Sequence, residues 1–380
     1  MSTLKKVADR ANVSMLEAYH ALKHTGDVDE QLIVHVNRIA QEMGYKLNIT
    51  QIDVADLAGV GKGTVSYALN GNSIIKAATR EKVLEAARLL NYRSNINARN
   101  LKTNRAGIIG YSWHVHDDPS RMNTLLDEFI YRVSLSTEAK GFHLLTFTQP
   151  QEGVERVYDE LIATNRVDGF IISDVSYKDP RIQRLIDVNA PFVAFGGMYL
   201  PEKDFALVDV DGVKGIQMVV EHLLSLGHER IGMINWHPSV MIGEVRERGY
   251  VTAMNNAGIQ INPNWVAYTP NILQSASQAT AQIMSSKHPP TAIVCANDVM
   301  AFGARAYLDE IGHHHVALTG YDDDPMAQFL GITSVRQPIA DVATTLVDIL
   351  LGEINEDPLP QRQVIFEAEL VIRKSSVPVR

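Results

Sequence analysis

The chain has 380 residues, of which 46% are hydrophobic, so it is long enough for two or three domains that each bury a core. Its single cysteine, Cys295, excludes an internal disulfide framework and a cysteine-based zinc site. The N-terminus lacks a signal-peptide-like apolar segment, and no uninterrupted apolar run is long enough to span a membrane. We therefore expect a cytoplasmic protein.

The formal net charge of -9 is unevenly distributed along the chain. Residues 1–48 carry six Lys and Arg against six Asp and Glu, residues 49–105 carry nine against four, and the remainder carries twenty against thirty-four. Only the middle block, with a balance of +5, has the basic excess that contact with phosphate requires. An acidic remainder helps to keep the rest of the chain off nucleic acid.

Residues 1–48 resemble an earlier copy of the middle block, displaced by 47 positions without a gap. Val7-Ala8-Asp9 matches Val54-Ala55-Asp56, and Asn12 stands where Gly59 does, so we expect the fold to be kept. The exposed face differs, because Met15, Leu16 and His20 replace Lys62, Gly63 and Tyr67.

Glu17 can form a capping box with Ser14, which would stabilise its helix while making the helix tip repel DNA. We interpret residues 1–48 as a degenerate or repurposed module. It would dock on the second copy or on a partner protein; the alternative is direct DNA contact through Lys5, Lys6 and Lys23.

Residues 53–69, DVADLAGVGKGTVSYAL, predict two short helices joined by a tight turn. Thr50 and Asp53 have the spacing of reciprocal capping, and Gly59 supplies the backbone freedom that the turn needs. A helix-turn-helix places its second helix in the DNA major groove. The residues that we expect to face DNA from this helix are Lys62, Gly63, Thr64, Ser66, Tyr67 and Asn70. A three-helix structural unit without a nucleic-acid role is the alternative.

The segment TREKVLEAARLLNY predicts a third helix, and RSNINARNLKTNRAG reads as a polar linker. Through DVADLAGV, TVSYALN, TREKVLEAARLLNY and NARNL the chain resembles the lac-repressor/galactose-repressor family of bacterial transcription regulators. The resemblance implies that Arg99 and Leu101 belong to a hinge helix that forms on DNA, with Leu101 wedged into the minor groove. Packing of Leu101 against the next domain is the alternative.

From Gly107 onward, seven short apolar runs alternate with helical patterns, which predicts an α/β fold with parallel sheets. The runs are GIIGYSW, FHLLTFT, GFIISDV, PFVAFG, RIGMINW, AIVCAN and VALTGYDD. About 270 residues suit two lobes with a cleft between them. This is the periplasmic-binding-protein-like architecture that the resemblance implies.

Several motifs in this region resemble those of the family, including VDVDGVKG, where Gly212 stands in place of the usual asparagine. By position, Arg246 and Asp298 are similar to the pair that hydrogen-bonds the effector in that family. A guanidinium and a carboxylate just beyond strand ends suit hydroxyl-rich or anionic ligands, and a structural salt bridge is the alternative. We also expect Gln337 to face the cleft.

Trp113, His114 and Trp236 end the first strands of the two lobes, where an aromatic face can stack on a sugar ring or a base. Trp236 can equally belong to the core. His313-His314-His315 is interpreted as a solvated turn without a carboxylate or cysteine nearby, so no metal and no cofactor are predicted.

We conclude that the sequence predicts a DNA-binding transcription regulator, a repressor in the first instance, controlled by a small, sugar-like molecule bound between two lobes. The expected domains are a degenerate repeat at 1–48, the DNA-binding unit at 49–93, a hinge at 94–106 and the effector domain at 107–380. Paired half-sites imply a homodimer. The main alternative is a solute-binding protein. No enzyme motif was found, so catalysis is not expected.

Overall fold

The computed structural model describes residues 3–69, 74–92, 105–114, 124–150, 153–201 and 204–377. The chain forms two compact units, a helical unit at Met1–Thr103 and an α/β unit at Asn104–Arg380. The expected residues Asn70, Arg99 and Leu101 lie outside the described residues.

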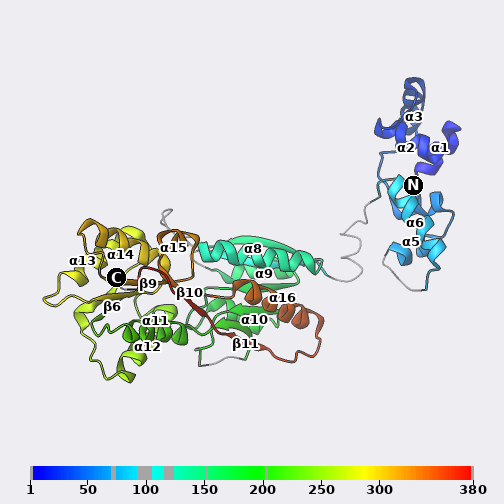
Figure 1. Ribbon diagram of the computed structural model, residues 1–380. Helices are drawn as coiled ribbons and strands as arrows, with labels where there is room; N and C mark the ends of the chain where they lie inside the picture. Colours follow the sequence, from blue (N-terminus) through cyan, green and yellow to red (C-terminus); the bar gives the residue numbers. More distant parts are fainter. Residues whose placement is uncertain are drawn as a thin grey trace. The chain divides into compact units, whose positions relative to one another are not determined.

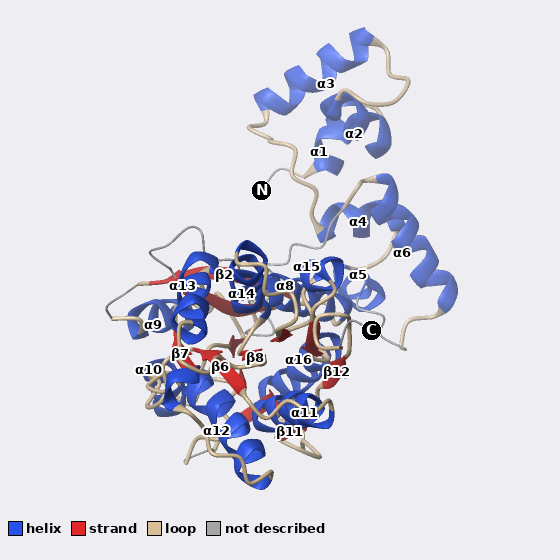
Figure 2. Ribbon diagram, turned by 60° about the vertical axis from the view of Figure 1, so that its left-hand side comes forward, coloured by secondary structure: helices blue, strands red, loops and turns tan. Residues whose placement is uncertain are grey.

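The helical unit contains two groups of three helices, α1–α3 and α4–α6 (Figures 1 and 2). Their bounds are α1 Leu4–Ala11, α2 Met15–Lys23, α3 Glu30–Glu42, α4 Gln51–Ala58, α5 Lys62–Leu69 and α6 Ala77–Leu89. Helices of the second group begin at residues 51, 62 and 77, which is 47 residues after their counterparts at 4, 15 and 30. The repeat seen in the sequence is thus also a repeat of structure.

The turns within the helical unit have the chemistry that the sequence predicted. Gly59 ends α4 with φ 66° and Asn12 ends α1 with φ 55°, so both occupy the left-handed region that glycine and asparagine tolerate best. Thr50 and Asp53 cap α4 reciprocally, as Ser14 and Glu17 do for α2. Because each cap satisfies amide groups that a helix start leaves unpaired, both short helices are stabilised locally.

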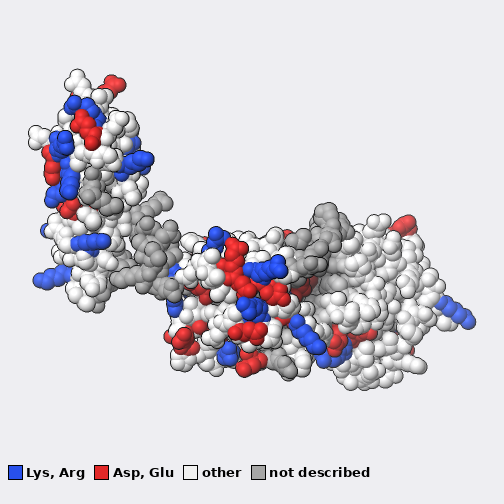
Figure 3. Space-filling model, turned by 180° about the vertical axis from the view of Figure 1, so that it is seen from behind, with Lys and Arg blue, Asp and Glu red and all other residues white. Residues whose placement is uncertain are grey.

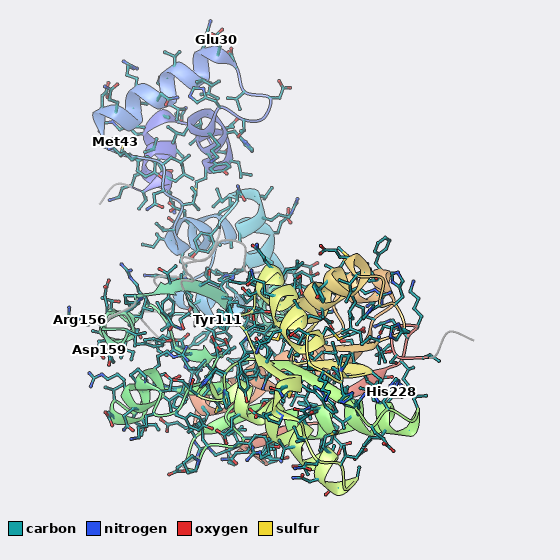
Figure 4. The ribbon with its side chains drawn as sticks, turned by 90° about the vertical axis from the view of Figure 1, so that its left-hand side faces the viewer. Glu30, Met43, Tyr111, Arg156, Asp159 and His228 are labelled. Carbon is teal, nitrogen blue, oxygen red and sulfur yellow. The ribbon has the colours of Figure 1, made fainter. Side chains whose placement is uncertain are left out.

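Both groups of helices contribute to one hydrophobic core (Figure 4). Leu4 and Val36 from the first group are fully buried, as are Val54 and Val65 from the second. Figure 4 shows Glu30 and Met43 at the two ends of α3. The first copy is therefore a folded part of the helical unit that packs on the second copy.

The α/β unit contains two six-stranded sheets, one in each lobe. The first lobe has the strand order β11-β5-β4-β3-β1-β2, all parallel, with bounds β1 Ile108–His114, β2 His143–Gln149, β3 Gly169–Ile172, β4 Phe192–Phe195, β5 Ala206–Val210 and β11 Gln363–Phe366. The second has the order β12-β10-β9-β8-β6-β7, with bounds β6 Ile231–Asn235, β7 Val266–Tyr268, β8 Ala292–Cys295, β9 Ala317–Tyr321, β10 Thr333–Arg336 and β12 Glu369–Val371. Only β12 pairs antiparallel among these described strands.

Helices cover both faces of each sheet, as Figure 2 shows. Those of the first lobe are α8 Thr124–Ala139, α9 Glu155–Ala163, α10 Pro180–Asp187 and α16 Ile339–Asn355. Those of the second are α11 Gly212–Ser225, α12 Met241–Asn256, α13 Leu273–Met284, α14 Asp298–Glu310 and α15 Pro325–Leu330, with a 3-10 turn at Pro263–Trp265. The chain passes between the lobes after β5, after β10 and after β11. The lobes are therefore joined by three segments at the edge of the cleft.

All seven predicted apolar runs form strands, so the prediction of parallel α/β lobes is confirmed. The seven runs do not include β5, β7, β10, β11 and β12. In β5 the apolar run is interrupted by Asp209, whose carboxylate accepts hydrogen bonds from the amides of Met198 and Val210. Within the described residues, no helix combines the length and apolar character needed to cross a lipid bilayer.

Candidate DNA-reading helix and effector cavity

Helix α5 presents a polar face to solvent and an apolar face to the core. Val65 and Ala68 are buried, which fixes the rotation of the helix about its axis. Lys62 and Gly63 are exposed and the Tyr67 side chain is 49% exposed, while Thr64 and Ser66 are half-buried. The structure thus places all five described candidate residues on one short helix, with the Lys62 and Tyr67 side chains exposed.

A cavity of about 660 Å³ lies between the two lobes of the α/β unit. The first lobe contributes aromatic and aliphatic side chains, among them Tyr111, Phe129 and Phe195, and the second contributes Trp236 and Val245. Polar groups converge on it from strand ends and loops of both lobes: Asp209, Arg246, Asn271, Asn297, Asp322 and Gln337. Such a lining, largely apolar with a few converging polar groups, is typical of small-molecule sites.

Arg246 is the only cation lining the cavity among the described residues, and it is 4% exposed. Its guanidinium carbon lies 3.1 Å from the centroid of the Tyr321 ring, an arrangement that supports a cation–π interaction. The Nε and Nη1 groups of Arg246 are buried and form no hydrogen bond with any described residue. Because unmade hydrogen bonds of buried donors are costly, these groups are available to a ligand acceptor.

Two carboxylates flank this guanidinium. Burial raises the pKa of Asp322 from 3.8 to about 6, although the charge of Arg246 and a hydrogen bond from Gln337 oppose the rise. Gln337 Nε2 donates to Asp322 Oδ1 at 2.8 Å. Burial also raises the pKa of Asp209. Asp322 has φ 109°, a strained backbone conformation of the kind found at functional sites.

Asp298 does not line the cavity, in contrast to Arg246. Its Oδ1 accepts a hydrogen bond from Ser334 Oγ, and its Oδ2 accepts one from the amide of Asp324, each at 2.7 Å. Both carboxylate oxygens are therefore engaged by protein groups, and no salt bridge joins Asp298 to Arg246 among the described residues. The sequence analysis placed Asp322 in the run VALTGYDD but did not assign it to the site.

The aromatic candidates are placed differently. Trp236 lines the cavity and also packs on the core of the second lobe, so its position is compatible with both interpretations. Trp113 and His114 end β1, paired with Thr148 and Gln149 of β2, and their side chains lie outside the described part of the structure.

The histidine tract differs from its prediction in one respect. His314 Nδ1 lies 3.0 Å from a carboxylate oxygen of Asp309, whereas no carboxylate was expected nearby. Still, the described residues contain no group of three or more His, Cys, Asp or Glu that could hold a metal ion.

Helix α12 also contacts the first lobe through a seam of two residue pairs, Tyr177–Glu244 and Tyr199–Arg248. Tyr177, in the loop after β3, donates a hydrogen bond to the Glu244 carboxylate. One turn further along α12, the guanidinium of Arg248 lies 4.0 Å from the centroid of the Tyr199 ring, in the loop after β4. Because Tyr177 and Tyr199 belong to the first lobe and α12 to the second, these contacts hold the lobes together.

Comparison with known proteins identifies the family to which the chain belongs. Residues 50–95 match the family described as bacterial regulatory proteins, lacI family, and residues 220–376 match the periplasmic binding protein-like domain. The HTH-type transcriptional regulator CelR of Thermobifida fusca is 31% identical over 336 residues, which cover 85% of this chain and 96% of CelR. The chain belongs to the LacI family.

Solved structures agree with this assignment to the LacI family. A regulatory protein of the LacI family from Chloroflexus aggregans is 33% identical, with a TM-score of 0.67, and covers 71% of this chain and 98% of its own. A lac repressor dimer bound to operator and the anti-inducer ONPF is 25% identical, with a TM-score of 0.74, and covers 87% of this chain and 100% of its own. This LacI-family protein is therefore a DNA-binding transcription regulator under the control of a small-molecule effector, and not a solute-binding protein.

Proposed function

We propose that α5 reads an operator and that the cavity between the lobes binds a neutral, hydroxyl-rich molecule of sugar type that changes the affinity for that operator. The ligand proposal depends mainly on the buried guanidinium of Arg246, which lies beside Asp322 and Asp209. Its Nε and Nη1 groups form no hydrogen bond with any described residue. A hydroxyl group accepts from the guanidinium and donates to a carboxylate at once, so neighbouring hydroxyls of one ring match this arrangement.

The charges at the site favour a neutral ligand over an anion. Three carboxylates, those of Asp174, Asp209 and Asp322, line the cavity with one guanidinium, so an anionic ligand would add repulsion. The aromatic wall, which includes Trp236 and Phe129, suits the apolar face of a sugar ring. Among the relatives, CelR has been solved in complex with cellobiose.

We further propose that Lys62 and Tyr67 contact base edges, with Gly63, Thr64, Ser66 and Asn70 beside them, while Arg99 and Leu101 act at the hinge. A bidentate or stacked base contact contributes about 1–3 kcal/mol to discrimination between sequences. The alanine variants of Lys62 and Tyr67 should therefore lose preference for a duplex selected by the wild-type protein. Equal loss on selected and random duplexes would show that neither residue reads sequence.

The remaining parts of the proposal follow from DNA recognition. Two half-sites require two reading helices at a fixed separation, so we propose a homodimer that acts in the cytoplasm as a repressor, as the lac repressor dimer does on its operator. The relatives are transcription regulators, and we propose that this chain likewise performs no catalysis. Turnover of a cleft-bound ligand, lost on Asp322→Ala, would contradict this.

The effector proposal is tested by a panel of mono- and disaccharides and nucleobases, read as a shift in melting temperature. We expect a neutral saccharide to raise the melting temperature of the wild-type protein and not that of Arg246→Ala. A nucleobase that gives the larger shift would replace the saccharide as the ligand class.

A further inference from the structure

The first copy of the helical unit is joined to the second through one buried carboxylate. Asp53 is 2% exposed, and its Oδ1 accepts a hydrogen bond from the amide of Leu4, the first residue of α1, at 3.1 Å. Its Oδ2 accepts from the amide and the hydroxyl of Thr50, both at 2.8 Å. The first turns of α1 and α4 therefore share one hydrogen-bonding partner, which fixes their relative placement.

Tyr45, in the segment between the two copies, packs against the common hydrophobic core. Burial, followed by the charge of Asp53, raises the pKa of Tyr45 to about 12. Together with the common hydrophobic core, these contacts make the first copy a fixed extension of the DNA-reading copy. What α1 exposes is thus held at a constant position beside α4.

Compared with the second copy, the first copy has gained exposed basic residues on α1 and has lost the candidate DNA-reading residues on α2. Lys5 and Lys6 are exposed on α1, where the second copy has Ile52 and Asp53 at the corresponding positions. Helix α2 has lost the base-reading side chains and carries Glu17 in its first turn. The helix that would enter a major groove thus has an acidic first turn and keeps Lys23 only in its last turn, whereas the helix that would cross the backbone has Lys5 and Lys6 in its first turn.

Charge is also segregated within the first copy. Helix α1 has Lys5, Lys6 and Arg10 against Asp9, a balance of +2, and residues 12–48 have three basic against five acidic residues, a balance of -2. Figure 3 shows basic side chains over both halves of the helical unit, with acidic ones among those of the half made by α1–α3. Arg10 lies 4.0 Å from Glu42 of α3, whereas Lys5 and Lys6 lie in the exposed first turn of α1.

We propose that Lys5 and Lys6 contact the DNA phosphate backbone next to the half-site that α5 reads. In a helix-turn-helix the first helix, here α4, crosses the DNA backbone. The first turn of α1 is hydrogen-bonded to the first turn of α4 through Leu4 and Asp53. The lysines follow directly after Leu4, so the same strand of phosphates passes within reach of their side chains. This inference rests on the proposed reading of DNA by α5. The contacts made by Lys5 and Lys6 lengthen the stretch of DNA that the protein covers, but they add no sequence discrimination.

The test is the salt dependence of DNA binding by the full chain. A Lys5→Gln/Lys6→Gln variant is compared with wild type on a duplex selected by the wild-type protein and on a random duplex. Each lost phosphate contact lowers the slope of log K against log salt concentration by about 0.9. We expect the slope to fall by about two, affinity to fall by the same factor on both duplexes, and hydroxyl-radical protection to shorten at one edge of each half-site.

The matched control is Lys23→Gln/Arg38→Gln, which removes the same charge from exposed positions on α2 and α3 of the same copy. It should keep the wild-type slope and footprint, and thermal melting should show that both variants stay folded. An unchanged slope for Lys5→Gln/Lys6→Gln, an equal fall in the control, or tighter binding by the variant would overturn the proposal. The proposed base reading by α5 is tested independently of this phosphate contact, because only Lys62→Ala and Tyr67→Ala should reduce the preference for the selected duplex.

Discussion

The guanidinium of Arg246 lies 3.1 Å from the centroid of the Tyr321 ring, and this contact places the cation at the wall of the cavity between the lobes. Tyr321 in turn has room only because residue 215 is glycine: a Cβ there would lie 2.5 Å from the Tyr321 hydroxyl oxygen. A glycine on α11 therefore helps to position the guanidinium that we propose binds the effector.

Replacing Arg246 with alanine should weaken effector binding by roughly 10- to 150-fold, because hydrogen bonds from a charged donor contribute about 1.5–3 kcal/mol. Isothermal titration calorimetry with a saccharide found in the screen measures this loss. The control is Arg305→Ala, on α14, whose side chain pairs with Asp309 away from the cavity. An equal loss in both variants would point to a general effect on folding.

Effector affinity should fall as the pH drops below about 6. A ligand hydroxyl donates to the ionised form of Asp322, and the raised pKa of about 6 means that the carboxyl group becomes protonated below this value. Affinity should then decrease by up to about tenfold per pH unit and stay constant above pH 7. In Asp322→Asn the step should vanish; a step that persists there would assign it to Asp209, whose pKa burial also raises.

The same protonation has the opposite effect on folding. Between pH 4 and pH 6 the native chain retains a proton on Asp322 that the unfolded chain has released. The free energy of unfolding should therefore decrease as the pH rises through this interval, and urea denaturation of wild type against Asp322→Asn measures the difference.

Asp298→Ala should lower the free energy of unfolding by about 2–5 kcal/mol, because it leaves the Ser334 hydroxyl and the Asp324 amide without their acceptor. Urea denaturation measures this loss. The dissociation constant of the effector, measured on the folded fraction, should change much less than in Arg246→Ala. Unchanged stability with a large loss of affinity would instead return Asp298 to direct ligand contact.

Tyr177→Phe should ease opening of the lobes, since it removes the hydroxyl that donates to Glu244 across the cleft. We expect the effector to dissociate about two- to fivefold faster, given that a partly exposed hydrogen bond contributes about 0.5–1 kcal/mol. Stopped-flow fluorescence measures the rate. Tyr268→Phe is the control, because Tyr268 donates to Glu247 within the second lobe. Identical rates for both variants and wild type would exclude a role for the seam.

Sequence patterns predicted most of the fold because its signals are local. The capping pair Thr50 and Asp53, the left-handed turn at Gly59 and the apolar runs of the sheets depend on neighbours in sequence. The strand β5 was missed because the half-buried Asp209 interrupts its apolar pattern. The carboxylate of Asp209 accepts hydrogen bonds from the amides of Met198 and Val210, which the sequence pattern does not reveal.

Of the two residues that the sequence predicted as a pair at the effector site, one lies at the cavity and the other does not. Arg246 lies at the cavity as expected, whereas Asp298 turns towards Ser334 and Asp322 takes the place beside the guanidinium. Both carboxylates follow a strand end, so their positions in sequence suit either role. What separates them is side-chain direction and the strained backbone of Asp322, which only tertiary structure determines.

The three passages of the chain between the lobes mean that neither lobe is a continuous stretch of sequence. The last forty residues include β11, which completes the sheet of the first lobe, and β12, which completes that of the second. A frameshift near the end of the coding sequence would thus damage both halves of the sensor together. A chimaera that borrows one lobe from a relative must be spliced at every passage, so new specificities are easier to obtain by point substitution around the cavity than by exchange of fragments.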